Sequence, residues 1–220
     1  MRFANLHLLI RSDPAFQTAL THPAPSYNLG FTAFGLGASH ALALAKVYLE
    51  FSDWDRAKEH AIERNVFRQT KATSNRRLER EFRLRLQTLT DDQLALLVSH
   101  PTEARVPIAL LAAFKRYGLV RDFSVEVLAE KLRHFDFELR PSDYSSFLEH
   151  LEPAHPEILK LTDTTLRKIR QVTFRVLCEG GILSSGRPHR IAPAILPDSV
   201  IEVIRRDDSA LLKPFLQPAL

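Results

Sequence analysis

Apolar residues return every three or four positions through most of the chain after residue 38. In the clearest case Leu78, Phe82, Leu86 and Leu89 fall at i, i+4, i+8 and i+11. This spacing places the four side chains on one face of an α-helix, whereas a half-buried strand would alternate apolar and polar residues. The sequence therefore predicts an all-α fold, a helical bundle in which amphipathic helices bury one face each.

Prolines and glycines divide the chain into three parts. The first forty residues contain six of them, too many for a long helix, and a second group of prolines lies between Pro153 and Pro156. We predict an irregular N-terminal segment over 1–38, a helical bundle over 39–152 and a C-terminal helical subdomain over 153–220. Within the first segment, Phe31 and Phe34 are expected to anchor the chain to the core.

Capping residues and breakers set the expected helix boundaries. Ser or Thr before an apolar run, Pro in a first turn and Gly after a last turn are the signals used. The expected helices are 39–51, one capped by Ser52 or Asp53, one capped by Thr73 or Ser74, then 91–99, 102–117, one capped by Ser124, one from Ser142 to Leu151, 163–179, and one starting at Pro197-Asp198.

The C-terminal part contains the outline of a winged helix. The helix 163–179 ends at Gly180-Gly181, and two short β-prone pieces, 182–183 and 190–192, flank residues 184–189. A helix followed by a basic hairpin is typical of winged-helix proteins, so we predict a wing at this position.

Positive charge is concentrated in two segments. The whole chain has a formal net charge of +4. Residues 65–87 hold seven basic against two acidic residues, and residues 160–190 hold the same numbers, so each carries +5 and the remainder carries −6. The chain is therefore an acidic scaffold with two basic segments, a pattern that favours an acidic partner such as nucleic acid.

The first basic segment has two interpretations. Arg76, Arg80 and Arg83 fall at i, i+4 and i+7 and form a stripe separate from the apolar one. In one reading the helix is a solvated surface with three i,i+4 ion pairs, Arg77 with Glu81, Glu79 with Arg83 and Glu81 with Arg85, which leave Arg76 and Arg80 unmatched. In the other, these arginines and the preceding loop residues contact phosphates; the candidate residues are Arg68, Lys71, Arg76, Arg80 and Arg83.

The second basic segment is open in the same way. A recognition-type helix would carry its charges into the major groove while the wing contacts the backbone. The alternative is a helical subdomain that happens to be basic. The candidate DNA-binding residues are Arg167, Lys168 and Arg170 on the helix, with Arg187 and Arg190, beside His189, in the wing.

Signatures of catalysis, cofactors and metals are missing from the sequence. Seven glycines form neither a phosphate-binding loop nor a dinucleotide fingerprint, and no two of the nine histidines share the i,i+4 spacing of zinc-binding helices. Pro197-Asp198 and Glu202 lack the lysine that a nuclease of the PD…ExK type needs. Cys178, the single cysteine, has no histidine near it in sequence, and Trp54 at a helix start suits packing better than base stacking. We expect no catalytic residues, no cofactor and no metal.

The chain is expected to lie in the cytoplasm. Asn5 and His7 interrupt the only apolar run near the start, so no signal peptide is expected. The apolar stretch 41–51 is about half the length that a bilayer span needs. We expect no membrane association.

Several segments resemble the BrxA family of bacterial BREX phage-defence systems. They cover most of the chain from about Gly30 onward, as loose patterns of apolar and basic residues rather than a rigid catalytic signature. The segments are Trp54, Asn65–Phe67, Arg68–Thr73 and Arg76–Leu86, then Ala109–Tyr117 with Asp122-Phe123, and finally Thr165–Lys168 and Leu177–Leu183.

The resemblance implies an all-helical protein in a cytoplasmic defence assembly that also contains a methyltransferase, an ATPase and an alkaline-phosphatase-like protein. It implies no catalytic residues. With the charge pattern, it favours a non-enzymatic accessory subunit that binds the backbone of duplex DNA through two basic faces and contacts other BREX components. The alternatives are a protein–protein adaptor whose basic faces dock acidic partners and, ranked lower because few aromatic residues lie among the arginines, an RNA-binding protein.

Overall fold

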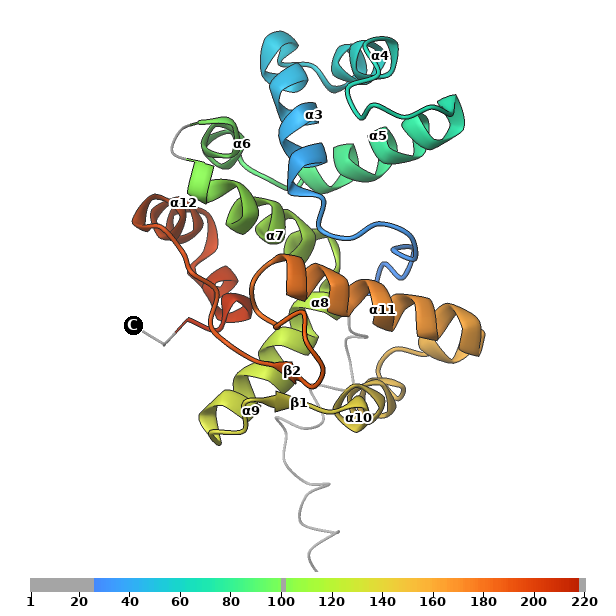
Figure 1. Ribbon diagram of the computed structural model, residues 1–220, viewed down its shortest axis with the longest axis vertical. Coiled ribbons are helices and arrows are strands. Elements are labelled where there is room, and N and C mark those ends of the chain that lie inside the picture. Colours follow the sequence, from blue (N-terminus) through green and yellow to red (C-terminus); the bar gives the residue numbers. More distant parts are fainter. Residues whose placement is uncertain (1–25, 100–101, 218–220) are drawn as a thin grey trace, which may run out of the picture.

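Helices form nearly all the regular structure of the computed structural model, which describes residues 26–99 and 102–217 (Figure 1). This confirms the predicted all-α fold. Residues 26–37 contain no helix, and the rest of the predicted irregular segment, residues 1–25, lies outside the described residues. The buried apolar side chains between Phe31 and Leu216 form one connected cluster, so the helices share a core.

Three helices form the first layer, drawn in blue and teal in Figure 1. They are α3 (Ala38–Phe51), α4 (Trp54–Glu63) and α5 (Ala72–Leu86). Asp53 caps α4 by accepting a hydrogen bond from the Arg56 backbone N–H at 2.7 Å. Trp54 stacks on Tyr48 of α3 with 4.0 Å between the ring centroids, which is the packing role expected for it.

Helix α5 buries the face that its periodicity indicates. Leu78, Phe82 and Leu86 are buried within it, and Leu89 is buried just after it. The helix starts at Ala72 with Lys71 at the cap position, so the expected caps at Thr73 and Ser74 are wrong by one turn or less.

The second layer carries the centre of the core. Thr90 forms a capping box with Gln93 at the start of α6 (Asp91–Val98). A 3₁₀ turn (Thr102–Ala104) leads into α7 (Arg105–Arg116), where Pro107 lies in the first turn and does not interrupt the helix. Every residue of α7 from Pro107 to Phe114 is buried, so α7 is the central element of the fold.

The expected helix cap at Ser124 is wrong. Helix α8 (Gly118–Asp122), a π-helical segment (Phe123–Leu128) and α9 (Ala129–Arg133) continue one another without leaving helical backbone angles. Ser124 lies inside this continuous helix, and its buried hydroxyl donates to the carbonyl oxygen of Pro214 at 2.7 Å. A capping-type residue here joins two distant parts of the chain.

The predicted wing is present and has one more strand than expected. Leu183 bridges Ile191 in antiparallel fashion, which joins the two predicted β-prone pieces. In addition, β1 (Glu138–Leu139) pairs antiparallel with β2 (His189–Arg190), so that Glu138 lies opposite Arg190 and Leu139 opposite His189. The small sheet therefore ties the wing to the middle of the chain.

Three further helices complete the fold. Helix α10 (Pro141–Leu151) follows β1, and a 3₁₀ turn (Ile158–Lys160) leads to α11 (Asp163–Glu179), whose bounds match the predicted helix. After the wing, α12 (Asp198–Asp208) and a 3₁₀ segment (Ser209–Phe215) return to the core, where Phe215 packs edge-on against Phe114. The predicted division near residue 153 stays a prediction. Across residues 26–99 and 102–217, no helix combines the length and the apolar character needed to span a bilayer.

Candidate nucleic-acid interface

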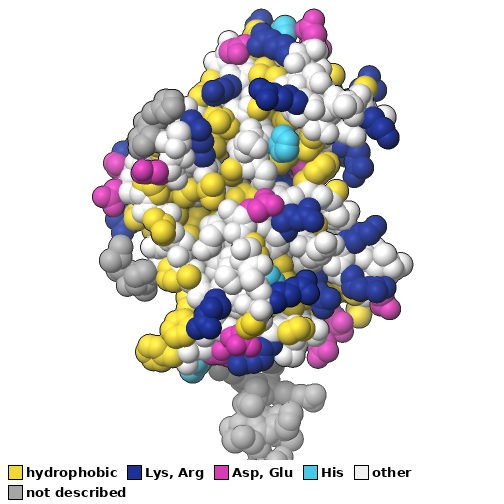
Figure 2. All heavy atoms as spheres, in the orientation of Figure 1, with side chains coloured by type: hydrophobic (Ala, Val, Ile, Leu, Met, Phe, Trp, Pro, Cys, Tyr) yellow, Lys and Arg dark blue, Asp and Glu magenta, His cyan; other side chains and the backbone are white. Residues whose placement is uncertain are grey.

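The structure places the two basic segments on one side of the molecule. Dark-blue side chains run from α5 down to α11 and the wing along the right-hand side of the face in Figure 2. On α5, Arg76 and Arg80 are exposed as predicted, and Arg77 lies over the ring of Phe34 at 5.6 Å. The ion pair expected between Arg77 and Glu81 is absent from the contacts of the described residues.

Residues 34–37 connect α5 to α11. Gly35 lies so close to α11 that a Cβ on it would approach the Cδ of Arg175 to 2.7 Å and the Oε1 of Glu179 to 2.6 Å. The Glu179 carboxylate accepts hydrogen bonds from the backbone N–H groups of Leu36, at 2.7 Å, and Gly37, at 3.3 Å. The end of α11 is therefore fixed to the start of α3.

Arg85 holds the same segment from the other side. Its side chain is 2 % exposed, and its guanidinium donates to the carbonyl oxygens of Phe34, Gly35 and Leu36 while pairing with Glu81 at 2.8 Å. Arg85 belongs to the basic segment that the sequence indicates, yet it is buried. The guanidinium of Arg85 therefore fixes the backbone of residues 34–36 and is not free to bind a ligand.

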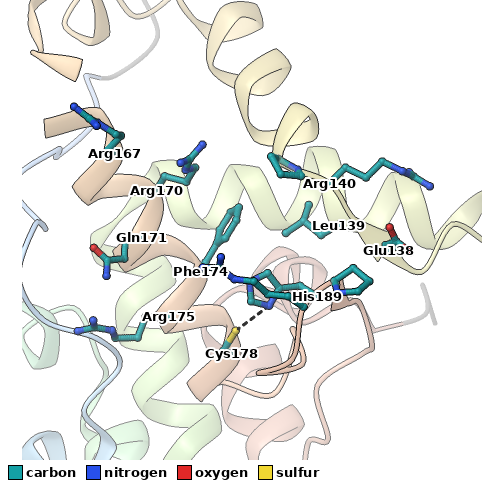
Figure 3. A pocket seen from close by; sticks show the side chains of 13 residues that line it. Glu138, Leu139, Arg140, Arg167, Arg170, Gln171, Phe174, Arg175, Cys178 and His189 are labelled. Atoms are coloured by element: carbon teal, nitrogen blue, oxygen red, sulfur yellow. Dashed lines mark hydrogen bonds between the residues drawn. The ribbon is translucent and has the colours of Figure 1, made fainter. Parts of the chain in front are cut away.

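Helix α11 and the small sheet line a basic hollow (Figure 3). Its volume is about 610 Å³. The apolar part of its lining is Phe174 with Leu139, Pro141 and Pro188. Glu138, Gln171, Cys178 and His189 also line it, and its arginines are Arg140, Arg167, Arg170, Arg175 and Arg187. We call this hollow the arginine pocket.

Most of the pocket arginines are not neutralised by carboxylates. Arg140 pairs with Asp136 at 2.7 Å, and this contact, together with the bond from Lys131, holds the pKa of the Asp136 carboxyl well below its usual range. Within residues 26–99 and 102–217, Arg170, Arg175 and Arg187 make no ion pair, and Arg167 contacts only the carbonyl oxygen of Asp163. Their charge is available to an anion.

Not all candidate residues lie at this pocket. Lys168 is exposed on α11, and Arg190 is exposed on β2 opposite Glu138, but neither lines it. Arg83 pairs with Glu79 at 2.6 Å, as the solvated-surface reading predicts, and Glu81 pairs with Arg85. The assignment of these residues to DNA contact stays a prediction.

The loop before α5 has a defined shape. The side-chain amide of Asn65 bonds the backbone N–H of Gln69, at 3.0 Å, and its carbonyl oxygen, at 2.9 Å. Asn65 and Arg68 both have positive φ angles, and Arg68 and Lys71 are exposed. The loop therefore presents two cations beside the exposed face of α5.

Phe174, Arg140 and Arg175 line the pocket but are not among the candidate residues of the sequence. The pattern of α11 assigns Leu166, Ile169, Thr173 and Val176 to the core and suggests that aromatic residues are scarce among the arginines. Phe174 instead lies on the arginine side of the helix, four residues from both Arg170 and Cys178. An aromatic residue spaced at i+4 from an arginine is the signal that could have identified it.

Cys178 and His189 meet in the pocket although eleven residues separate them in sequence. Sγ of Cys178 lies 3.8 Å from Nδ1 of His189, and the same nitrogen contacts the carbonyl oxygen of Ser184 at 2.7 Å. The fold therefore brings a histidine to Cys178 that is not near it in sequence. Burial and the neighbouring Glu179 raise the pKa of the Cys178 thiol, which favours the protonated, unreactive form.

A smaller basic hollow lies where α5 meets the connecting segment. Its volume is about 310 Å³, and Arg77, Arg80 and Arg116 line it together with Glu81 and residues 30–34. Arg77 reaches Phe34, and Gly35 lies against Arg175, so this hollow and the arginine pocket are consecutive along the same surface. We call the combined area, from Arg76 to the wing, the basic surface.

Comparison with known proteins identifies relatives for most of the chain. The family model described as BrxA matches residues 25–208. A protein named "BREX protein BrxA" from Bacillus cereus (strain H3081.97) is 29% identical over 167 residues, which cover 75% of this chain and 81% of that protein. A protein of the same name from Paramagnetospirillum magneticum is 23% identical over 185 residues, covering 84% and 92%.

A third such protein, from Escherichia coli O9:H4 (strain HS), is 22% identical over 163 residues, covering 74% of this chain and 76% of that protein. The fold also has a solved counterpart. A crystal structure of an uncharacterized protein from Magnetospirillum magneticum superposes with a TM-score of 0.76 at 20% identity, over 89% of this chain and all of the other. This similarity supports the helical architecture described above.

Proposed function

Because the chain belongs to the BrxA family, we propose that it is a non-enzymatic accessory subunit of a bacterial BREX defence system, located in the cytoplasm, that binds duplex DNA through the basic surface. Its relatives carry the name of a BREX protein, which supports the first part of the proposal. The arrangement of arginines supports the second part.

The observation that carries the DNA proposal is the continuity of the basic surface. The two basic segments are far apart in sequence, and the clamp of Arg85 and Glu179 on residues 34–37 brings them onto one side. Within the described residues most arginines along this path lack carboxylate partners. Each such cation that meets a phosphate releases about one condensed counterion, so a row of them favours a polyanion.

Helix α11 and the wing, at the lower end of this surface, support a proposal that the protein contacts a groove of the duplex. Exposed Arg167, Lys168 and Gln171 lie on α11, and the wing lies beside this helix. A helix of this kind enters the major groove while its wing follows the backbone. The exposed arginines of α5 would then contact phosphates further along the duplex.

The test is fluorescence anisotropy with a labelled duplex across a series of salt concentrations. The wild type is compared with Arg76→Glu/Arg80→Glu and with Arg167→Glu/Lys168→Glu. A matched control, Arg205→Glu/Lys213→Glu, reverses two exposed cations on α12 and the following 3₁₀ segment, outside the basic surface. We expect each test pair to lower the slope of log K against log salt by about 2, since each phosphate contact contributes roughly 0.9, and we expect the control to keep the wild-type slope.

Failure of the wild type to bind duplex DNA at low salt would overturn the DNA proposal. It would leave an adaptor role, in which the basic surface docks an acidic protein partner. Equal loss of binding in the control and the test pairs would show that net charge, not this surface, governs the interaction.

A further inference from the structure

The arginine pocket is deeper than contact with a duplex backbone requires. Phosphates of a duplex lie on a convex surface, and exposed arginines such as Arg76 and Arg80 reach them without a hollow. The pocket of about 610 Å³ falls instead in the range of sites that enclose a ligand, roughly 300–1,000 Å³. It has room for a group the size of one nucleotide.

The apolar part of the pocket suits the flat face of a base. Phe174 projects from α11 into the hollow, and Leu139 and His189 lie across from it on the small sheet (Figure 3). Tyr144 and His189 meet the Phe174 ring edge-on, at 5.5 and 5.6 Å between centroids, and Phe123 stacks on it at 6.0 Å. These contacts fix the orientation of the ring, so little conformational entropy is lost when a base stacks on its open side.

The rim of the pocket suits the phosphates on either side of that base. Arg167 and Arg170 lie along α11 (Figure 3), and Arg187, two residues before β2, also lines the hollow. Within the described residues these three arginines have no carboxylate partner. Gln171 adds an amide that both donates and accepts hydrogen bonds, as the edge of a base does.

We propose that the arginine pocket accepts one unpaired nucleotide of a DNA strand, with its base on Phe174 and its flanking phosphates on Arg167, Arg170 and Arg187. The proposal rests on the DNA binding proposed above and specifies the kind of DNA that this surface prefers. A base within an intact duplex is stacked on both faces and must be extruded first, whereas a bulged base is already free to enter.

The experiment compares three labelled duplexes of the same sequence by fluorescence anisotropy at one salt concentration. One is fully paired, one contains a single unpaired adenine, and one contains an abasic residue at the same bulge. The two bulged duplexes have the same number of phosphates and differ only in the bulged base, so a difference between them reports the effect of that base. We expect the wild type to bind the adenine bulge about tenfold more tightly than the abasic bulge, since stacking of one base on an aromatic ring has this magnitude.

Phe174→Leu tests the ring directly, because leucine keeps an apolar side chain but has no flat face. We expect the ratio between the two bulged duplexes to fall to about one, while affinity for the paired duplex stays within about twofold of wild type. Phe135→Leu is the matched control: Phe135 is 81% exposed on the loop after α9 and does not line the pocket, so its ratio stays at the wild-type value. Thermal melts monitored by circular dichroism confirm that both variants are folded.

The outcomes separate this inference from the proposed function. A wild-type ratio near one, with salt-dependent binding of the paired duplex, overturns the pocket inference and leaves DNA binding in place; this comparison needs no variant. No binding of any duplex overturns both. Binding of free deoxyadenosine monophosphate as tightly as the adenine bulge would overturn the assignment to a DNA strand.

Discussion

Replacing Arg85 by alanine is expected to destabilise the protein more than any change on the exposed part of the basic surface. The substitution leaves the Glu81 carboxylate without its ion-pair partner, although the Tyr117 hydroxyl still donates to it, and leaves three carbonyl oxygens, those of residues 34–36, without a donor. Breaking a buried pair by removing one member costs about 3–5 kcal/mol. We therefore expect the free energy of unfolding to fall by about 4 kcal/mol, and the melting temperature of a chain of this size to fall by about 10 °C.

Urea unfolding followed by circular dichroism measures this loss, and two variants of α5 calibrate it. Arg85→Lys keeps the charge but cannot fork to several carbonyls, so a loss of about 2 kcal/mol is expected. Arg76→Ala removes an exposed arginine of the same helix and is expected to change stability by no more than about 0.5 kcal/mol. If Arg85→Ala were as mild as Arg76→Ala, the guanidinium would not hold residues 34–37, and the reasoning that joins α5 to α11 would be refuted.

Three further predictions concern stability. Thr90→Ala removes the cap of α6 and is expected to lower the free energy of unfolding by about 1 kcal/mol in urea titrations; an unchanged midpoint would contradict the capping box. Hydrogen bonds from Lys131 and Arg140 lower the pKa of Asp136 below its ordinary value of 3.8. The Asp136 carboxylate therefore stabilises the fold above pH 3.8, and this contribution is lost as the pH falls below that value. In Asp136→Asn the melting temperature is expected to fall less steeply with acid than in the wild type. Burial raises the pKa of Tyr117 from 10.0 to about 12, so stability falls as pH rises through this interval, and a Tyr117→Phe variant with the same alkaline fall as wild type would show that another group is responsible.

The sequence predicted those elements whose signals are local. Helix α11 was placed correctly because its apolar period is regular and glycines follow it. Asp53 was one of two predicted caps of α4, since a capping hydrogen bond spans only three residues. Ser124 carries the same type of signal, but its hydroxyl bonds Pro214, far away in the chain. A local pattern does not distinguish a cap from a long-range contact.

The candidate site depended on contacts that no local pattern contains. The arginine pocket combines residues 138–141, 167–178 and 187–189, and strand β1 is two residues long, too short for a periodic signal. Arg85 was counted with its exposed neighbours because charge alone does not indicate burial. The charge distribution therefore predicted the basic segments, whereas the tertiary fold determines which arginines face solvent and which bind backbone carbonyl oxygens.

The pairing of β1 with β2 also joins two segments that are synthesised at different times. Glu138 leaves the ribosome long before its partner Arg190. Strand β1, which lines the arginine pocket, therefore has no partner strand while α10 and α11 are synthesised. A nascent or truncated chain that stops before residue 187 has the arginines of α11 but no wing to face them. Such a fragment exposes the arginines of α11 without the facing wing, so the arginine pocket exists only once nearly the whole chain has been translated.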